Sequence, residues 1–144
     1  MSEEKMIPVV KNESYTITIE DLTVEGEGVG KVEGYALFVP GGLPGDTLEV
    51  KVLKTKKSYG YAKIERIVKP SDNRCVPMCP IAIQCGGCQL QHLRYKAQLS
   101  FKRSKVEEAL KRIGGFEGIK VEETIGMGNP YHYRNKAQYP VREV

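Results

Sequence analysis

The stretch Thr47-Leu-Glu-Val-Lys-Val-Leu-Lys-Thr-Lys56 alternates apolar and polar side chains along its first half. Alternation with a period of two is typical of a β-strand that is buried on one face. Leu48, Val50 and Val52 share one face, so we expect these three side chains to point into a core. Residues 15–20 alternate in the same way and predict a second strand.

Three more short apolar runs lie between turns that are rich in glycine and proline. One run precedes Gly34, and the others cover residues 35–39 and 61–68. Five short strands with such turns predict a small closed five-stranded β-barrel of OB-like architecture. The glycines at 26, 28 and 30 are not followed by a helical pattern, so they do not predict a nucleotide-binding loop.

The rest of the chain predicts a protein that is mainly β with one α-helix. Residues 1–12 have the pattern of a loose lead-in, and residues 70–92 that of a turn-rich link. Apolar residues spaced by three or four predict a helix over residues 93–113, ended by Gly114 and Gly115. We expect further short strands at residues 119–125 and 136–141, as the start of a second domain.

The link contains the stretch Cys79-Pro-Ile-Ala-Ile-Gln-Cys85-Gly-Gly-Cys88. Three thiols at this spacing, with glycines that allow close backbone approach, indicate metal ligands. Iron–sulfur and zinc both stay open on spacing alone, with Cys75 or His92 as a possible further donor. Buried apolar thiols and a redox pair at Cys85 and Cys88 are the competing interpretations.

Charge changes sign along the chain, which has 22 Lys and Arg against 18 Asp and Glu. Residues 1–50 have a net charge of −7, residues 51–69 of +6 and residues 70–144 of +5. A basic region of this kind favours a polyanionic partner such as RNA. No apolar run is long enough to cross a membrane, and the charged N-terminus is not a secretory signal, so we expect a cytoplasmic protein.

Cations and aromatic rings alternate within residues 54–63. Lysines on one strand face can follow phosphates while tyrosines stack on unpaired bases. The alternative is that the tyrosines pack on the barrel wall and the lysines form a solvated face. The residues predicted to contact RNA in this region are Lys54, Lys56, Lys57, Tyr59, Tyr61 and Lys63.

Residues 7–69 resemble a TRAM domain, an RNA-binding barrel found in RNA-modifying enzymes. The shared stretches are Ile19-Glu-Asp-Leu22, Gly26-Glu-Gly-Val-Gly30, Phe38-Val-Pro-Gly41, Pro44-Gly-Asp46 and Lys54-Thr-Lys-Lys-Ser-Tyr59. The run CPxxxxCGGCQLQHLxYxxQL that begins at Cys79 resembles the cluster loop of RNA uracil-5-methyltransferases that bind a [4Fe-4S] cluster and modify 23S rRNA. Tyr133-Arg-Asn-Lys136 and the residues up to Val141 resemble the opening of the central domain of the same family.

This resemblance implies a division into a TRAM barrel (7–69), a [4Fe-4S] loop (70–92) and a helix with the start of a central α/β domain (93–144). It implies that Cys79, Cys85 and Cys88 are cluster ligands, with a fourth cysteine far downstream, and that Arg134 and Lys136 contact RNA. The family transfers a methyl group from S-adenosylmethionine to carbon 5 of a uridine after a cysteine attacks carbon 6. We therefore expect the N-terminal part of a monomeric 23S rRNA (uracil-5-)-methyltransferase.

The catalytic and cofactor-binding residues of the family belong to a C-terminal domain that has no counterpart in these 144 residues, so we assign no catalytic residue and expect no activity from this chain alone. The alternative function is a stand-alone TRAM module with a structural zinc site. A zinc-ribbon adaptor without an RNA role is a third interpretation.

Overall fold

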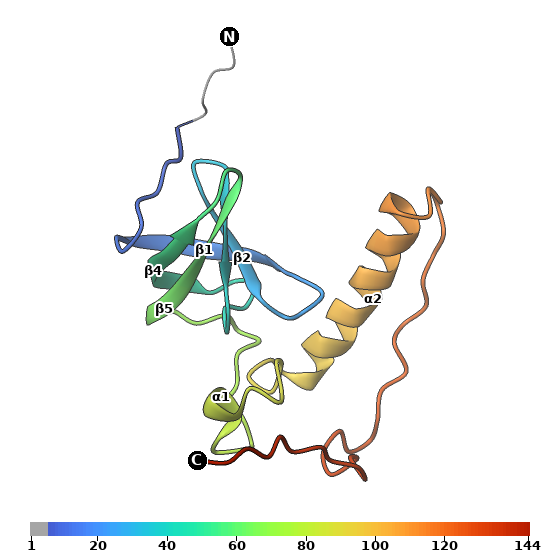
Figure 1. Ribbon diagram of the computed structural model, residues 1–144. Coiled ribbons are helices and arrows are strands. Elements are labelled where there is room, and N and C mark those ends of the chain that lie inside the picture. Colours follow the sequence, from blue (N-terminus) through green and yellow to red (C-terminus); the bar gives the residue numbers. More distant parts are fainter. Residues whose placement is uncertain (1–5) are drawn as a thin grey trace. The chain divides into compact units, whose positions relative to one another are not determined.

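The computed structural model describes residues 6–144 and contains a closed five-stranded barrel (Figure 1). Its strands are β1 (Ser14–Leu22), β2 (Gly28–Val32), β3 (Tyr35–Val39), β4 (Thr47–Thr55) and β5 (Tyr59–Lys69). They close in the order β1-β2-β3-β5-β4, in which β3 and β5 are parallel and the other neighbours antiparallel. The predicted OB-like barrel is confirmed.

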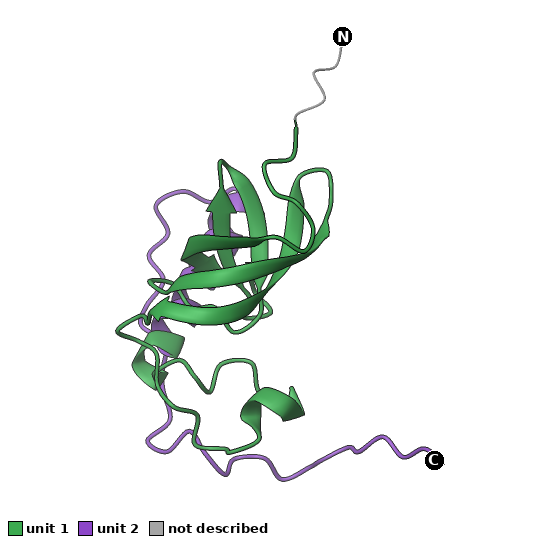
Figure 2. Ribbon diagram, turned by 90° about the vertical axis from the view of Figure 1, so that its left-hand side faces the viewer, with its two compact units in different colours: residues 1–98 green, residues 99–144 purple. Residues whose placement is uncertain are grey.

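Two helices follow, α1 (Ala82–Cys85) and α2 (Tyr95–Arg112). The chain divides into two compact units, of which the first ends at Gln98 and the second runs from Leu99 to Val144 (Figure 2). The helix predicted over residues 93–113 is confirmed as α2. Gly115, with a φ of +68°, lies just beyond its end, and the amide of Phe116 donates to the Leu110 carbonyl oxygen at 3.0 Å.

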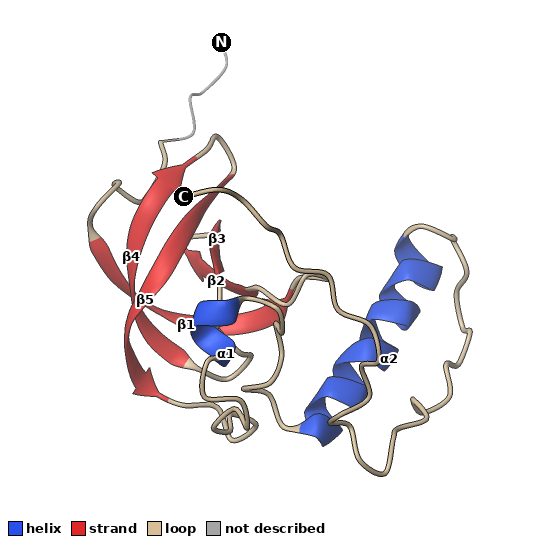
Figure 3. Ribbon diagram, turned by 60° about the horizontal axis from the view of Figure 1, so that its bottom comes forward, coloured by secondary structure: helices blue, strands red, loops and turns tan. Residues whose placement is uncertain are grey.

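The strands predicted at residues 119–125 and 136–141 are wrong for this structure. Within the described range, all residues after α2 are loops and turns (Figure 3). A strand needs a neighbour for its backbone hydrogen bonds, and neither segment has one here. Several of their apolar side chains are exposed: Ile125 is 97% exposed and Val141 is 94% exposed.

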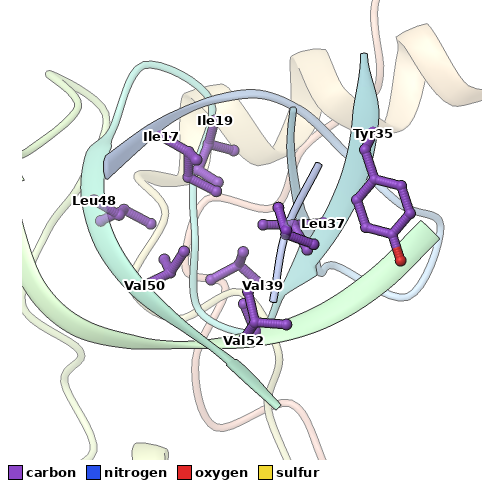
Figure 4. Close-up of a cluster of buried hydrophobic side chains, with 10 residues drawn as sticks. Ile17, Ile19, Tyr35, Leu37, Val39, Leu48, Val50 and Val52 are labelled. Carbon is purple, nitrogen blue, oxygen red and sulfur yellow. The ribbon is translucent and has the colours of Figure 1, made fainter. Parts of the chain in front are cut away.

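The barrel core contains the residues that the alternating pattern predicted to be buried (Figure 4). Leu48, Val50 and Val52 are fully buried, as predicted. Ile17 and Ile19 from β1 and Leu37 and Val39 from β3 fill the same interior, because alternate residues of every strand face inward. Burial of each such side chain stabilises the fold by about 1.5–3 kcal/mol.

The expected loose lead-in is partly wrong. Residues 1–5 lie outside the described residues, but Val9 belongs to the barrel core and is 4% exposed. The amide of Asn12 donates to the Val52 carbonyl oxygen at 2.8 Å. The chain is therefore attached to the barrel several residues before β1 begins.

A buried carboxylate joins the barrel to the cysteine segment (residues 70–92). Asp46 is fully buried and accepts hydrogen bonds from the amides of Leu43 at 2.8 Å and Ser71 at 2.7 Å. The Arg74 guanidinium pairs with both carboxylate oxygens and also donates to the Gly41 carbonyl oxygen at 2.7 Å. Both ends of this ion pair are satisfied, which a buried charge requires.

The cysteine segment folds back on itself next to this ion pair. Arg74 and Leu93 form a β-bridge, and Leu93 is 4% exposed. The Cys75 amide donates to the His92 carbonyl oxygen at 2.8 Å, and the Arg94 amide to that of Asn73 at 2.8 Å. The two ends of the cysteine segment are thus held together at the barrel wall.

No helix in the described part of the chain is both long enough and apolar enough to cross a membrane.

We predict that Asp46→Asn lowers the free energy of unfolding by about 3–5 kcal/mol, because it leaves the Arg74 guanidinium without its buried counter-charge. Urea unfolding followed by circular dichroism measures this change. Glu49→Gln is the matched control, since Glu49 pairs with Arg66 at 2.9 Å on the surface. The control is expected to cost less than about 1 kcal/mol, and equal losses in the two variants would contradict the assignment.

The stability of the barrel should also fall in acid through Asp46. Burial alone would raise the pKa of Asp46, but Arg74 and the amides of Ser71 and Leu43 outweigh burial and lower the pKa below its ordinary value. A lowered folded-state pKa gives stability that is present above the unfolded-state pKa and is lost as pH falls through the folded-state pKa. We expect the free energy of unfolding to drop below about pH 4, and to drop less in Asp46→Asn. If the free energy of unfolding falls equally steeply below about pH 4 in the wild type and in Asp46→Asn, other carboxylates cause the loss.

Candidate RNA interface

Three aromatic side chains gather on the outer face of β3 and β5. We call Phe38, Tyr59 and Tyr61 the aromatic patch. The ring centroids are 5.4 Å apart for Phe38 and Tyr59, 5.9 Å for Phe38 and Tyr61, and 5.8 Å for the two tyrosines. All three rings are partly exposed, whereas the alternate residues Leu37, Gly60 and Ala62 are buried.

The strand register explains why the rings meet. The parallel pairing of β3 and β5 places Phe38 opposite Tyr61 and Ala36 opposite Tyr59. The charge interaction with Tyr59, followed by desolvation, raises the pKa of Tyr61 above its ordinary value. The Tyr61 hydroxyl is therefore neutral near pH 7 and can donate a hydrogen bond.

Four of the predicted lysines lie near this patch on β4, β5 and the turn between them. Lys54 on β4 is in register with Tyr61, and Lys63 follows Tyr61 by two residues on the same face of β5. Lys56 and Lys57 lie in the turn between β4 and β5. All four are exposed, and none of them forms an ion pair with another residue of the 6–144 range. Their charges are therefore available to an anionic ligand.

The buried Tyr35 fixes the turn that carries these lysines. Its single O–H lies within hydrogen-bond distance of two carbonyl oxygens, those of Lys56, at 2.8 Å, and Tyr59, and is shared between them. The hydroxyl oxygen also accepts from the Lys56 amide at 3.1 Å. Gly60 lies beside it, and a Cβ there would lie 2.7 Å from the Lys54 carbonyl oxygen. The close approach of β4 and β5 at this turn therefore requires glycine.

The cysteine segment carries four free thiols. Cys75 and Cys79 are partly buried, whereas Cys85 and Cys88 are exposed. Cys85 is the last residue of α1, and Gly86 after it has a φ of +67°. The Gln91 side-chain oxygen accepts from the Cys79 amide at 3.2 Å, which ties the first predicted ligand to the end of the segment.

Thiolates are suitable donors for an iron–sulfur cluster, and three of them lie on one loop. However, no group of three or more His, Cys, Asp or Glu side chains among the described residues is arranged to hold a metal ion. Cys79, Cys85 and Cys88 are therefore not gathered into a formed site in this structure.

His92, the other possible zinc donor, lies where the cysteine segment meets the barrel. Burial, followed by the charge of Arg74, lowers the pKa of His92, so its imidazole is neutral at pH 7. Its Nε2 atom is buried without a hydrogen-bond partner among the described residues. His92 also lines a cleft of about 1240 Å³ between barrel and cysteine segment, together with Arg74, Cys75 and Cys88.

Arg134 and Lys136, the remaining predicted RNA contacts, lie in the second compact unit. Both are exposed and belong to an irregular segment. The structure leaves their assignment as a prediction.

Sequence reasoning missed Phe38, Tyr35 and the ion pair of Asp46 with Arg74. Phe38 could have been recognised as outward-facing, because Tyr35, Leu37 and Val39 occupy the inward positions of the same strand. No sequence signal places Phe38 beside Tyr61 or Asp46 beside Arg74, because both pairs depend on strand order and chain reversal.

Comparisons with known proteins identify the domain type of the barrel. Residues 8–64 match the family model described as TRAM domain. The chain is 50% identical over 140 residues to a protein of Halalkalibacterium halodurans named "Uncharacterized RNA methyltransferase", covering 97% of this chain and 31% of that protein. It is 53% identical over 131 residues to a protein of the same description from Listeria monocytogenes serovar 1/2a, covering 91% of this chain and 29% of that protein.

A solved structure, Pyrococcus abyssi tRNA (uracil-54, C5)-methyltransferase in complex with S-adenosyl-L-homocysteine, is 34% identical and covers 69% of this chain and 21% of that one. The TM-score between the two structures is 0.43.

The fold and the matched residues define a TRAM domain protein. Residues 8–64 form a TRAM domain, and the chain is similar over more than nine-tenths of its length to proteins named RNA methyltransferases. It spans about a third of the length of the curated relatives it matches.

We predict that Tyr35→Phe loosens the β4–β5 turn without unfolding the barrel. The Lys56 amide keeps its 2.8 Å bond to the Tyr59 carbonyl oxygen, so the cost is that of lost hydrogen bonds, about 0.5–1.5 kcal/mol. Amide hydrogen exchange should become faster at residues 56–59 and stay unchanged at Val50.

Tyr15→Phe is the matched control, because the Tyr15 hydroxyl accepts from the Val10 amide at 2.8 Å in a different part of the barrel. It should accelerate exchange at Val10 only. Unchanged exchange at residues 56–59 in Tyr35→Phe would mean that strand pairing alone holds the turn.

Proposed function

We propose that this chain is the RNA-binding N-terminal region of an S-adenosylmethionine-dependent enzyme that methylates carbon 5 of a uridine in 23S rRNA. The observation that supports RNA binding is the aromatic patch with unpaired lysines around it on one barrel face. Uracil specificity and the rRNA target are supported by the cluster-loop and central-domain stretches that begin at Cys79 and Tyr133. The protein acts as a cytoplasmic monomer in this proposal.

Within such an enzyme, this chain supplies binding and not chemistry. Exposed lysines compensate phosphate charge, and aromatic rings offer stacking surface to unpaired bases. S-adenosylmethionine would supply the methyl group when bound in the catalytic domain, and no residue of this chain is assigned to that step. Arg134 and Lys136 are proposed as further phosphate contacts.

Cys79, Cys85 and Cys88 are proposed as three ligands of a [4Fe-4S] cluster, with the fourth ligand supplied by a downstream cysteine in the longer protein. The cluster would have a structural role, because its loop connects the barrel to α2 and the catalytic residues of the family belong to a C-terminal domain. This requires the loop to rearrange so that its sulfurs converge, which the exposed Cys85 and Cys88 and the flanking glycines permit.

Salt titration of RNA binding tests the proposed function. The 144-residue chain should bind a fluorescent single-stranded RNA weakly, and its affinity should fall steeply with salt. Changing Lys54, Lys56 and Lys57 together to alanine should lower the log–log salt slope by roughly 2 to 3, because about three phosphate contacts are lost.

The matched control changes Lys11, Lys111 and Lys120 to alanine, which removes the same charge elsewhere. An equal slope change in both triple variants would show that only net charge matters. Tyr59→Ala should cost about 1–3 kcal/mol of binding with the slope nearly unchanged, if the ring stacks on a base.

The cluster assignment is tested on the longer protein prepared without air. It should be brown and contain about four iron and about four sulfide per chain. Cys85→Ser should lose the iron and its visible absorbance, whereas the matched Cys75→Ser should keep both. Stoichiometric zinc without visible absorbance in protein never exposed to air would overturn the assignment and favour the zinc module.

A further inference from the structure

The surroundings of the aromatic patch are not uniform in charge. Across neighbouring strands the outward residues follow the order Val29 on β2, Phe38 on β3, Tyr61 on β5 and Lys54 on β4. Lys63 is the next outward residue of β5 after Tyr61. The side of the patch toward β4 is therefore cationic.

On the opposite side, toward β2, the outward residues include Glu27 close to Phe38 and, further along the strand, Lys31, whose charge is paired with Glu20 at 3.9 Å. Glu27 precedes Val29 by two residues on the outward face, since Gly28 and Gly30 are the buried positions. It is thus a diagonal neighbour of Phe38 across the β2–β3 pair. The charges of Glu27 and Glu25 reach the Tyr61 hydroxyl, where they contribute to its raised pKa after the larger effects of Tyr59 and desolvation.

The turn that holds these glutamates is well ordered by hydrogen bonds. The Glu27 amide donates to the Thr23 hydroxyl oxygen at 3.1 Å, and the Thr23 amide donates to the Glu27 carbonyl oxygen at 2.8 Å. Gly26 between the two glutamates has a φ of +86°, and its amide donates to the Thr23 carbonyl oxygen at 3.0 Å. The carboxylates are therefore attached to a fixed backbone beside the rings.

We propose that the aromatic patch is a site for one unpaired nucleobase that carries an exocyclic amino group. The phosphates of its strand lie on the side of Lys54 and Lys63, and the edge of the base points toward Glu25 and Glu27. This inference rests on the proposed RNA binding and adds a base preference to it. The base selected here is therefore a different one from the methylated uridine, because uracil lacks the amino group.

Hydrogen-bond chemistry explains the preference. An ionised carboxylate only accepts hydrogen bonds, so it pairs with the amino group of cytosine, adenine or guanine. At the same position uracil presents a carbonyl oxygen, which is a second acceptor and is repelled. Phosphate is repelled by the same carboxylates, which fixes the direction of the nucleotide across the patch.

Cytidine and uridine oligomers give the sharpest comparison, because their rings have nearly equal stacking area and differ in this donor. Fluorescence anisotropy of labelled octamers with the 144-residue chain at pH 7.5 should show tighter binding of the cytidine octamer. The expected ratio is about three- to tenfold, the size of one net hydrogen bond. Phe38→Leu should weaken binding of both octamers, whereas Tyr139→Leu, which changes an exposed ring in the second unit, should not.

The double variant Glu25→Ala with Glu27→Ala should bind both octamers at least as well as the wild type and lose the cytidine preference. The matched double variant Glu122→Ala with Glu123→Ala removes the same charge and should keep the preference. An equal affinity of wild type for both octamers, or a preference that survives removal of Glu25 and Glu27, would overturn the inference while leaving RNA binding intact. Failure of the wild type to bind either octamer would instead overturn the proposed function.

Discussion

The carboxylate of Asp46 is fully buried, and the placement of the cysteine segment depends on how its charge is compensated. The barrel supplies one amide, from Leu43, and every other donor comes from the chain after β5. Without Ser71 and Arg74 the carboxylate would be an uncompensated charge beside the core, which costs several kcal/mol. The barrel and the cysteine segment therefore each supply part of the hydrogen-bonding of this ion pair, which attaches the segment to the barrel.

At the other end of β4, a second buried polar group, the Tyr35 hydroxyl, also fixes a neighbouring segment of the chain. The ring of Tyr35 belongs to the core, while its hydroxyl bonds the backbone of Lys56 and Tyr59. The turn that carries exposed cations is thus fixed from inside, although its own side chains have no partners in the described residues. An RNA ligand would meet lysines on a preformed backbone, which lowers the entropy cost of binding.

The strands of the barrel could be predicted from the sequence because each one is indicated by the pattern of its own residues. Alternation in residues 47–52 and 15–20 identifies strands and their inward faces directly, and glycine-rich turns separate them. Only two of the three residues of the aromatic patch could be predicted from the sequence. Tyr59 and Tyr61 are recognisable from their spacing, but Phe38 joins them through a parallel pairing of β3 with β5 that no local pattern specifies. The strands predicted at residues 119–125 and 136–141 are not formed, because the alternating pattern is present but the described residues provide no partner strand for either segment.

The order of the strands also places segments of opposite charge next to each other on the barrel surface. The acidic first part of the chain, residues 1–50, supplies β2, β3 and Glu27. Residues 51–69 supply six of the seven lysines between the start of β1 and the end of β5. Because β5 lies between β3 and β4, the rings stand where the acidic and the basic part meet. The same net charge spread evenly over the barrel would attract RNA without orienting it. A boundary between the two signs that runs through an aromatic surface orients a nucleotide, since phosphates and base edges prefer opposite sides of it.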